Sequence, residues 1–264
     1  MCPTPIGNLG DVTLRVLEAL READAIACED TRRTRVLLER YEISGALVSY
    51  HEHNERERAR ELLVRIERGA VVALVSDAGM PLVSDPGYAL VRACQESGVK
   101  VEVLPGPSSV TTALVASGLP ADRWRFVGFL PRKRGELEQV LSEGEETLVA
   151  FESPARLATT LAVLAALEGE RPAAVCRELT KLHEEVRRGS ATELAAYYAE
   201  HAPRGEIVLV VGAVTAASRD RDEALASLRA LVDAGAKARP AAGVIANLTG
   251  VGANELYRAL TDSR

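Results

Sequence analysis

The chain has 264 residues, of which 47% are hydrophobic and 27% are charged, and its net charge is −6. This composition is typical of a globular protein with a large core and room for more than one domain, and it excludes a surface coated throughout with positive charge for nucleic acid. No apolar run approaches the roughly 18 residues of a membrane helix, and no signal peptide opens the chain, so we expect a cytoplasmic protein without a membrane partner.

The first 112 residues alternate between short apolar runs and longer amphipathic stretches. Strands are expected at residues 25–28, 71–75 and 101–104. Helices are expected after Asp11, around residues 36–38, at 54–68, up to Ser97 and at 111–117. Strands separated by helices of this length predict a parallel sheet with right-handed crossovers.

The segment Gly118-Leu119-Pro120 marks an expected domain boundary. Beyond it, strands are expected at residues 126–129, 147–151, 173–177, 184–188 and 207–211, with helices at about 154–168 and 190–200. From Ala216 the pattern is helical and alanine-rich, with a turn at Gly250 and Gly252 that predicts a helix-turn-helix-like appendage. The expected fold class is α/β, with a parallel-sheet domain at 1–117, a mixed-sheet domain at 118–215 and the helical appendage at 216–264.

Residues 76–87, with the sequence SDAGMPLVSDPG, form the most distinctive loop and directly follow the expected strand at 71–75. A Gly/Pro/Asp-rich loop between a strand and a helix marks the carboxyl edge of a parallel sheet, where open α/β sheets bind ligands. Three more loops have this position, at residues 4–11, 28–34 and 105–110. We expect one sheet edge to gather all four, although each loop taken alone is compatible with an ordinary connection.

Several motifs of other protein classes are absent from the sequence. There is no GxGxxG, GxxxxGK[ST] or GxSxG pattern, which argues against a usual Rossmann dinucleotide site, a P-loop nucleotide hydrolase and a serine hydrolase. The four cysteines are scattered without a CxxC pair, so we expect reduced, mostly buried thiols and no metal site. Together, the loops favour a moderately polar ligand of nucleoside size.

Ten ordered motifs spread over residues 4–212 resemble those of the ribosomal RNA small-subunit methyltransferase I family. They are PIGNLGD, EDTR, HEHNE, SDAGMPLVSDPG, PGPSS, SGLP, GFLPRK, FESPAR, RELTKLHEE and RGE. The resemblance implies a two-domain tetrapyrrole-methylase fold that transfers a methyl group from S-adenosylmethionine to the ribose 2′-hydroxyl of a cytidine in the decoding region of 16S rRNA. It also implies that the partner is 16S rRNA or the small ribosomal subunit and that the protein is a homodimer.

The same resemblance implies that the cofactor, S-adenosylmethionine, lies in the cleft between the two α/β domains. Carried over by position, the cofactor-binding residues are Leu9, Gly10, Asp77, Gly79, Met80, Ser108, Ser109, Phe151, Glu152, Gly205 and Glu206. Of the two aspartates in the 76–87 loop, we expect Asp77 to face the cofactor. We expect Asp85, which precedes Pro86 and Gly87, to cap the next helix, so that its loss mainly lowers stability.

The sequence departs from the family pattern in three places. Members have a longer apolar strand before PIGNLG, whereas Met1-Cys2-Pro3 precedes Thr4 here. Either the first strand is truncated or the true start lies upstream, and a central parallel strand this short is expected to lower stability. Met80 stands where a small polar residue is common. The C-terminal appendage has few lysines where a more basic stretch is common, which bears on the grip on RNA and leaves the chemistry unaffected.

Methyl transfer to a ribose hydroxyl, a poor nucleophile, is helped by a nearby base or by a cation that stabilises the developing alkoxide. The candidate catalytic residues are Asp30, His53, Glu178 and Lys181. Each also has a plainer interpretation. Asp30 is compatible with a salt-bridged carboxylate, His53 with a surface histidine, and the last two with an ordinary ion pair.

The candidate RNA-binding residues are Arg32, Arg33, Arg132, Lys133 and Arg177. A guanidinium group stays protonated and binds phosphate in a forked geometry, so Arg32 and Arg177 are better phosphate contacts than catalysts. The EDTR and HEHNE motifs are expected on the RNA side of the cleft and RELTK on its far wall. Each basic cluster is also compatible with a solvated surface, and only convergence in space would make a path for RNA.

Two other functions remain open from the sequence. One is a small-molecule methylase of the same fold that acts on a tetrapyrrole precursor. The other is a non-catalytic RNA- or ribosome-binding protein, which would not bind S-adenosylmethionine.

Overall fold

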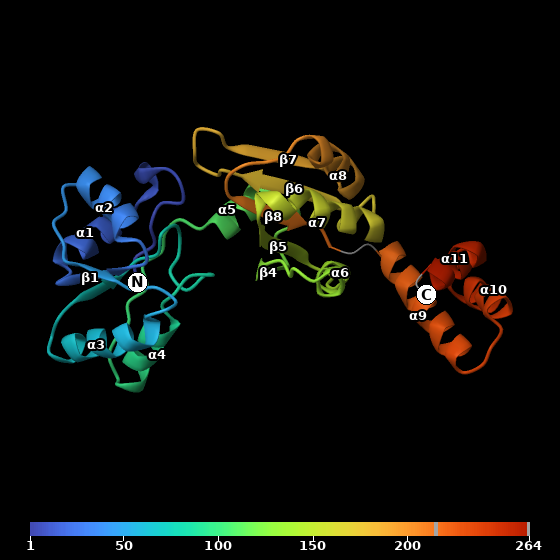
Figure 1. The fold of residues 1–264 in the computed structure, drawn as a ribbon, viewed down its shortest axis with the longest axis horizontal. Coiled ribbons are helices and arrows are strands. Elements are labelled where there is room, and N and C mark those ends of the chain that lie inside the picture. The colour runs from blue at the N-terminus through green and yellow to red at the C-terminus, as the bar shows by residue number, and fades with distance from the viewer. Residues whose placement is uncertain (214–215, 263–264) are drawn as a thin grey trace.

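The computed structural model describes residues 1–213 and 216–262 of the chain. It contains a first α/β unit, a second α/β unit beside it, and a helical appendage that projects away from both (Figure 1). The α/β fold class expected from the sequence is therefore confirmed.

The first sheet consists of three parallel strands. These are β1 (Ala25–Cys28), β2 (Leu47–Ser49) and β3 (Val72–Leu74), in the order β2-β1-β3. Ile26 lies opposite Leu47 on one side and opposite Ala73 on the other. The expected parallel sheet is confirmed, but β2 was not among the expected strands because its three residues are too few and too exposed to give a clear apolar pattern.

Helices cover both faces of this sheet (Figure 1). They are α1 (Leu14–Glu22) and α2 (Thr31–Arg40) on one face, and α3 (Glu55–Glu67) and α4 (Tyr88–Glu96) on the other. Side chains alternate between the two layers along β1, so Ile26 and Cys28 pack with α1 and α2 whereas Ala27 packs with α3 and α4. Burial on both faces explains why the strand is apolar without interruption.

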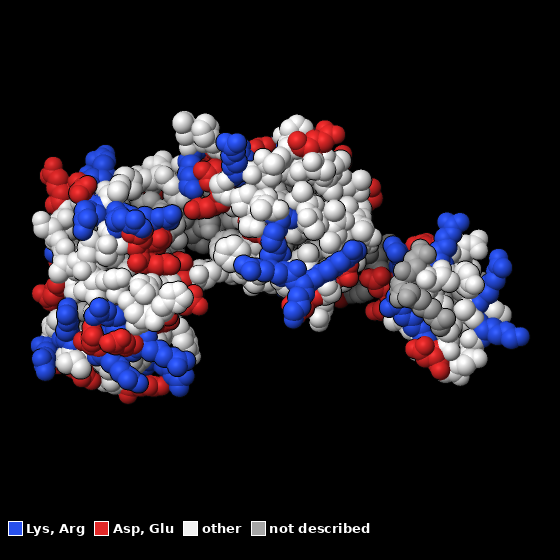
Figure 2. Space-filling model, viewed as in Figure 1, with Lys and Arg blue, Asp and Glu red and all other residues white. Residues whose placement is uncertain are grey.

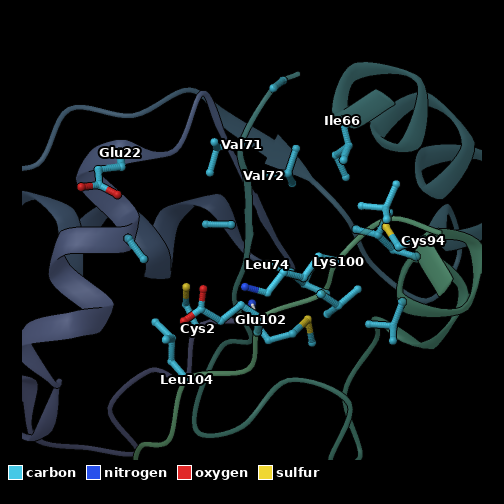
Figure 3. Close-up of a pocket in the computed structure, with 18 of the residues that line it drawn as sticks. Cys2, Glu22, Ile66, Val71, Val72, Leu74, Cys94, Lys100, Glu102 and Leu104 are labelled. Atoms are coloured by element: carbon cyan, nitrogen blue, oxygen red, sulfur yellow. Dashed lines mark hydrogen bonds between the residues drawn. The ribbon is translucent and has the colours of Figure 1, made fainter. Parts of the chain in front are cut away.

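Residues 101–104 do not form the strand expected from the sequence. Their backbone contacts in the described part of the chain are with Met1, whose N-terminal amine donates to the Glu102 carbonyl at 2.8 Å and whose carbonyl accepts from the Leu104 N–H at 3.1 Å. Cys2 in turn donates to the Leu74 carbonyl at 2.9 Å. A strand needs a continuous series of backbone hydrogen bonds to a neighbouring strand, and residues 101–104 have only these two within the described residues. A cavity of about 460 Å³ lies between this segment and β3 (Figure 3).

The second sheet has five strands. They are β4 (Trp124–Phe129), β5 (Thr147–Glu152), β6 (Pro172–Arg177), β7 (Glu185–Ser190) and β8 (Ile207–Val211), in the order β4-β5-β8-β6-β7. The β4–β5 pair is parallel, and the other three pairs are antiparallel. The expected mixed sheet is therefore confirmed, including the strand expected at 184–188.

One helix joins the two units. The outer face of the second sheet packs against α6 (Arg134–Ser142), α7 (Pro154–Leu167) and α8 (Ala191–Glu200). Its inner face packs against α5 (Ser109–Ser117), which follows the 105–110 loop of the first unit. Ile6, from the first loop of the chain, is buried in the same cluster as α5. The two units are thus held together by a shared apolar core that starts in the loops of the first.

The appendage is a three-helix unit with a core of its own. It consists of α9 (Ala216–Asp233), α10 (Ala238–Thr249) and α11 (Ala253–Asp262). Helix α10 ends at Gly250 in the left-handed conformation (φ 77°), which supports the turn expected there. No helix within residues 1–213 and 216–262 is long and apolar enough to cross a membrane. All four cysteines are free and buried, as expected.

Candidate active site

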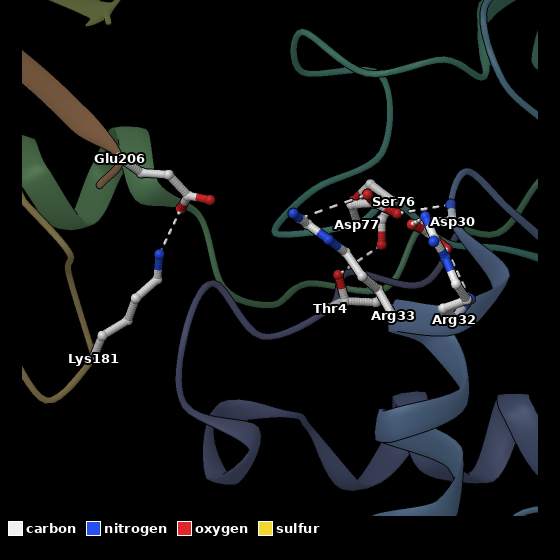
Figure 4. Close-up of polar contacts among 8 residues, drawn as sticks. All are labelled: Thr4, Asp30, Arg32, Arg33, Ser76, Asp77, Lys181 and Glu206. Atoms are coloured by element: carbon white, nitrogen blue, oxygen red, sulfur yellow. Dashed lines mark hydrogen bonds and ion pairs between the residues drawn. The ribbon is translucent and has the colours of Figure 1, made fainter. Parts of the chain in front are cut away.

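The loops that follow the strands of the first sheet lie together at one edge. Thr4 and Gly79 exchange two backbone hydrogen bonds of 2.9 Å, and the Thr4 hydroxyl donates to the Ser76 carbonyl at 2.9 Å (Figure 4). The 105–110 loop is equally close, since a Cβ built on Gly106 would lie 2.8 Å from the Pro3 side chain. A Cβ built on Gly79 would also lie 3.7 Å from the Pro107 carbonyl, and the Asp30 N–H donates to Asp77, so one sheet edge gathers all four loops.

A cavity of about 360 Å³ lies between this edge and the second sheet. Its lining comes from three places: the 76–87 loop, the start of α5, and the ends of β4, β5 and β8. Both units therefore contribute to one concave, partly apolar site, which is the usual form of a small-molecule pocket. Gly79 has a φ of 87°, a conformation that glycine adopts without strain, and this lets the backbone line the cavity directly.

Most of the residues expected at a cofactor line this cavity. They are Gly79, Met80, Ser108, Ser109, Phe151, Glu152, Gly205 and Glu206. Leu9, Gly10 and Asp77 are not part of the lining. The Leu9 carbonyl instead accepts a hydrogen bond of 2.7 Å from the Tyr41 hydroxyl, and the Gly10 N–H donates to the Asn8 side chain.

The second unit supplies an aromatic wall and a buried carboxylate. Phe151 lies between Phe126 and Phe129, with ring centroids 5.0 and 5.4 Å away. Glu152 beside it is 2% exposed, and its oxygens accept from the Ser153 N–H at 2.7 Å and the Thr160 hydroxyl at 2.6 Å. Both oxygens of Glu152 are thus occupied by its own unit, and the residue holds the wall of the cavity in place.

Asp30 and Asp77 form a polar cluster at the edge of the first sheet (Figure 4). Asp77 accepts a hydrogen bond of 2.9 Å from the Asp30 N–H and lies 3.6 Å from the Arg33 guanidinium. Asp30 is the N-cap of α2, and hydrogen bonds from the side chain and backbone of Arg32 lower the pKa of its carboxyl to about 2. A carboxylate with so low a pKa is a weak base, so the geometry favours the structural interpretation of Asp30.

On the facing wall, Lys181 joins Glu178 to Glu206. Its ammonium group lies 2.9 Å from Glu178 Oε1 and 3.1 Å from Glu206 Oε2 (Figure 4). Burial lowers the pKa of Lys181, but the hydrogen bonds to its two partners outweigh this effect and raise it overall. The hydrogen bonds from Lys181 and from the Glu206 backbone lower the pKa of Glu178. Lys181 is therefore a permanent cation beside a residue that lines the cavity.

The backbone around this ion pair has an unusual conformation. Glu178 and Thr180 have φ values of 51° and 66°, which side chains other than glycine rarely adopt. Gly205 has a φ of 84°, and a Cβ built on it would overlap the Glu178 carboxylate. Strain of this kind is concentrated at functional sites, where the surrounding contacts hold it in place.

The HEHNE segment contains a helix cap that sequence reasoning missed. Glu55 Oε1 accepts hydrogen bonds of 2.9 Å from the N–H groups of both Gly87 and Ala89, at the start of α4. The expectation that Asp85 caps this helix is wrong, because Gly87 is the N-cap and Glu55 from α3 takes the free N–H groups. His53 lies on the exposed side of the segment, with its ring 5.9 Å from that of His51.

Asp85 instead lines the cavity. Burial raises the pKa of Asp85 to about 6, the charge of Glu29 adds to the rise, and a hydrogen bond with Ser76 opposes it. The sequence did indicate a place for Asp85 at the ligand, because this residue lies in the 76–87 loop. Its role was misassigned because the helix it precedes is capped by a residue 30 positions earlier in the chain.

The candidate RNA-binding residues lie at three separate places. Arg32 and Arg33 belong to α2 beside the polar cluster, with side chains 85% and 61% exposed. Arg132 and Lys133 precede α6 on the second unit, and Figure 2 shows blue side chains over this region. Arg177 ends β6 and pairs with Glu185 at 2.8 Å, which neutralises part of its charge. Within the described ranges, no group of three or more His, Cys, Asp or Glu residues is arranged to hold a metal ion.

Comparison with a protein-family model matches residues 2–195 to the tetrapyrrole (corrin/porphyrin) methylases. Three bacterial relatives are named ribosomal RNA small subunit methyltransferase I. The protein of Mesorhizobium japonicum is 49% identical, with 98% of this chain and 90% of the relative covered. That of Micromonospora olivasterospora is 47% identical (97% and 84%), and that of Escherichia coli O157:H7 is 43% identical (97% and 92%).

Solved structures show a similar fold over about four fifths of the chain. Uroporphyrin-III-C-methyltransferase from Thermus thermophilus has a TM-score of 0.58 at 25% identity, covering 80% of this chain and 92% of that protein. A second structure of the Thermus thermophilus enzyme, in complex with S-adenyl homocysteine, has a TM-score of 0.55 at 22% identity, covering 80% and 95%. Diphthine synthase has a TM-score of 0.64 at 18% identity, covering 81% and 89%.

Proposed function

This chain belongs to the ribosomal RNA small subunit methyltransferase I family of the tetrapyrrole methylases, and we propose that it methylates the ribose 2′-hydroxyl of a cytidine in the decoding region of 16S rRNA, with S-adenosylmethionine as methyl donor. The observation that carries the proposal is the cavity of about 360 Å³, to which loops of the first unit and strand ends of the second both contribute. Five of the ten motifs named above supply residues of its lining: SDAGMPLVSDPG, PGPSS, GFLPRK, FESPAR and RGE.

The residues of the cavity fit S-adenosylmethionine chemically. The rings of Phe129 and Phe151 offer an apolar wall to a planar base, and the hydroxyls of Ser108 and Ser109 offer donors and acceptors to the ribose. The acidic side chain of Glu206 suits an ammonium or sulfonium charge. The fold neighbour with bound S-adenyl homocysteine supports the same ligand class.

The methyl donor supplies an activated methyl group, and this chain's own residues supply positioning and charge. Lys181 keeps its proton, so it acts as a cation that stabilises the oxygen of the substrate as negative charge develops there. Glu178 and Glu206 hold that ammonium group beside the cavity. Asp77 supports the site from outside its lining by joining the loop after β1 to the loop after β3.

RNA approaches, in this proposal, over the exposed arginines of α2 and the basic residues before α6. The net charge of −6 makes a purely electrostatic grip weak, so the assembled small subunit, with a shaped surface, is a better substrate than free 16S rRNA. Lower salt should strengthen binding to either. We further propose that the protein acts in the cytoplasm, as a homodimer.

The test is methylation of purified small ribosomal subunits with methyl-labelled S-adenosylmethionine, followed by nuclease digestion and mass spectrometry. Label on the ribose of a single decoding-region cytidine is expected. Label on a base, or on no nucleoside, would contradict the assignment of the 2′-hydroxyl as the methyl acceptor. A parallel reaction with a uroporphyrin-type tetrapyrrole should give no product, and calorimetry with S-adenosylmethionine should give a binding heat, which a non-catalytic ribosome-binding protein would lack.

A further inference from the structure

We propose that Asp85 is the general base that accepts the proton of the substrate hydroxyl, an inference that rests on the proposed transfer to a ribose oxygen. Asp85 lies in the 76–87 loop and lines the cavity from the first unit, and the aromatic rings of Phe129 and Phe151 line it from the second. The carboxylate is therefore on the surface that the methyl donor and the reacting nucleotide would share.

Three acidic side chains line the cavity: Asp85, Glu152 and Glu206. Glu152 has both oxygens hydrogen-bonded within its own unit and lies 3.3 Å from the Arg156 guanidinium. Glu206 is paired with Lys181. Within the described residues, Asp85 has no ion pair with any lysine, arginine or histidine, so it is the acid of the lining whose lone pairs remain available for a proton.

The four candidates from the sequence fit this role less well. None of Asp30, His53, Glu178 and Lys181 belongs to the lining of the cavity. The carboxyl of Asp30 is held by Arg32, and the ammonium of Lys181 is already protonated between two carboxylates. A general base must come within hydrogen-bond reach of the proton it takes, and among these five residues Asp85 alone lines the cavity.

The loop around Asp85 has an unusual backbone conformation. Leu82 and Ser84 have φ values of 73° and 64°, and Gly87 has a φ of 144°, so the backbone on both sides of the aspartate has conformations that favour glycine. Ser84 approaches the second unit, since a Cβ built on Gly128 would lie 3.7 Å from its hydroxyl. Because Glu55 caps α4 in place of Asp85, the aspartate is free to face the cavity.

The surroundings of Asp85 are suited to a base at neutral pH. The groups near it are Ser76, whose hydroxyl donates to the Gly79 carbonyl, and the acids Glu29 and Asp77, the latter paired with Arg33. Burial and these negative charges raise the pKa of Asp85 to about 6. At pH 7 the side chain is mostly ionised, yet a far stronger base than an exposed carboxylate.

The step balances as a simple displacement. The substrate O–H bond breaks and its proton passes to an oxygen of Asp85. The electron pair left on the substrate oxygen forms the new O–CH3 bond while the S–CH3 bond of the donor breaks, so the positive sulfonium leaves as a neutral thioether. Asp85 then releases the proton to water, which restores the carboxylate.

The test compares the wild type with Asp85→Asn in single-turnover methylation of small subunits at saturating S-adenosylmethionine, from pH 5 to pH 9. We expect the wild-type rate to rise with pH and level off above about 6, and the variant to be slower by about 10²- to 10⁴-fold. Calorimetry should give donor dissociation constants within about threefold of each other. Glu96→Gln, an exposed acid-to-amide change on α4, is the matched control and should behave as wild type.

Two outcomes would overturn the proposal. One is a wild-type rate that is flat between pH 5 and pH 7, which needs no variant to observe. The other is an Asp85→Asn rate that a higher donor concentration restores to the wild-type value. Asp85 would then contribute to donor binding and would not be the general base. Failure of the wild type to label ribose at all is a separate result, because it contradicts the proposed function before any variant is made.

A measurement without donor or RNA gives an independent readout. Since the pKa of Asp85 is raised in the folded protein, ionising it costs stability as the pH rises through about 6. The melting temperature of wild type should therefore fall relative to that of Asp85→Asn between pH 4 and pH 7. A constant difference across this range would show that the carboxyl is not buried as the proposal requires.

Discussion

The backbone N–H of Asp30 donates a hydrogen bond of 2.9 Å to Oδ1 of Asp77. This bond joins the end of β1 to the loop after β3, so it connects two loops that are far apart in the chain (Figure 4). Arg33 strengthens the junction from α2, 3.6 Å from the second oxygen of Asp77. The junction positions the backbone of Gly79 and Met80, which line the cavity.

Asp77→Ala should therefore weaken binding of S-adenosylmethionine. The change removes an acceptor for the Asp30 N–H and the partner of Arg33, and the loss of one such hydrogen bond costs about 1–3 kcal/mol, or roughly ten- to hundredfold in affinity if the loop must reorder on binding. Calorimetry at fixed pH measures this. Glu102→Ala, which removes an exposed ion pair with Arg15 far from the cavity, is the control, and equal affinity in both variants would contradict the prediction.

Lys181→Met should slow methyl transfer by about 10²-fold while leaving the donor affinity close to that of wild type. The change removes the cation and leaves Glu178 and Glu206 unpaired beside the cavity. Lys181→Arg retains the charge and should keep part of the rate. Single-turnover rates and calorimetry separate the two effects, and a Met variant as fast as the Arg variant would show that the charge is not used.

Gly205→Ala should destabilise the protein and displace the Glu178–Lys181 pair. The added Cβ would overlap the Glu178 carboxylate, and the φ of 84° is unfavourable for alanine, so a cost of about 1–3 kcal/mol is expected. Gly135→Ala is the matched control, because this glycine lies in α6 and a Cβ there would meet nothing within 4 Å. The control should be neutral or slightly stabilising. Urea unfolding compares the two, and equal midpoints would refute the prediction.

Glu55→Gln should lower the stability of the start of α4. Burial raises the pKa of Glu55, but hydrogen bonds from the Ala89 and Gly87 backbone outweigh it, so the pKa is lowered overall. Stability from a lowered carboxyl pKa is present above the unfolded value of about 4.3 and is lost as the pH falls through the folded value. The wild type should exceed the variant by about 1 kcal/mol at pH 7, and the difference should shrink below pH 4. Urea unfolding at several pH values measures it, and a difference independent of pH would mean that the carboxylate is not the cap.

The elements that the sequence predicted well are those whose signal is local. Residues 25–28 and 71–75 are short apolar runs bounded by turn residues, and both lie in or next to buried strands of the parallel sheet. The loops that follow them contain glycine, proline and aspartate because the chain must turn and approach a ligand there, and these residue types are readable without a structure. The family follows from the ordered motifs for the same reason.

Features that depend on residues distant in the chain, such as strand pairing and the capping of α4, were decided by the tertiary structure. Residues 101–104 have the composition of a strand but hydrogen-bond to Met1 over a short stretch, so the segment stays outside the sheet. Glu55, and not the adjacent Asp85, caps α4 because packing of α3 against α4 brings its carboxylate to the free N–H groups. Local composition sets which residues turn, bury and ionise, whereas the partner of each polar group is chosen by long-range packing. The role of Asp85 at the cavity is a consequence of that choice.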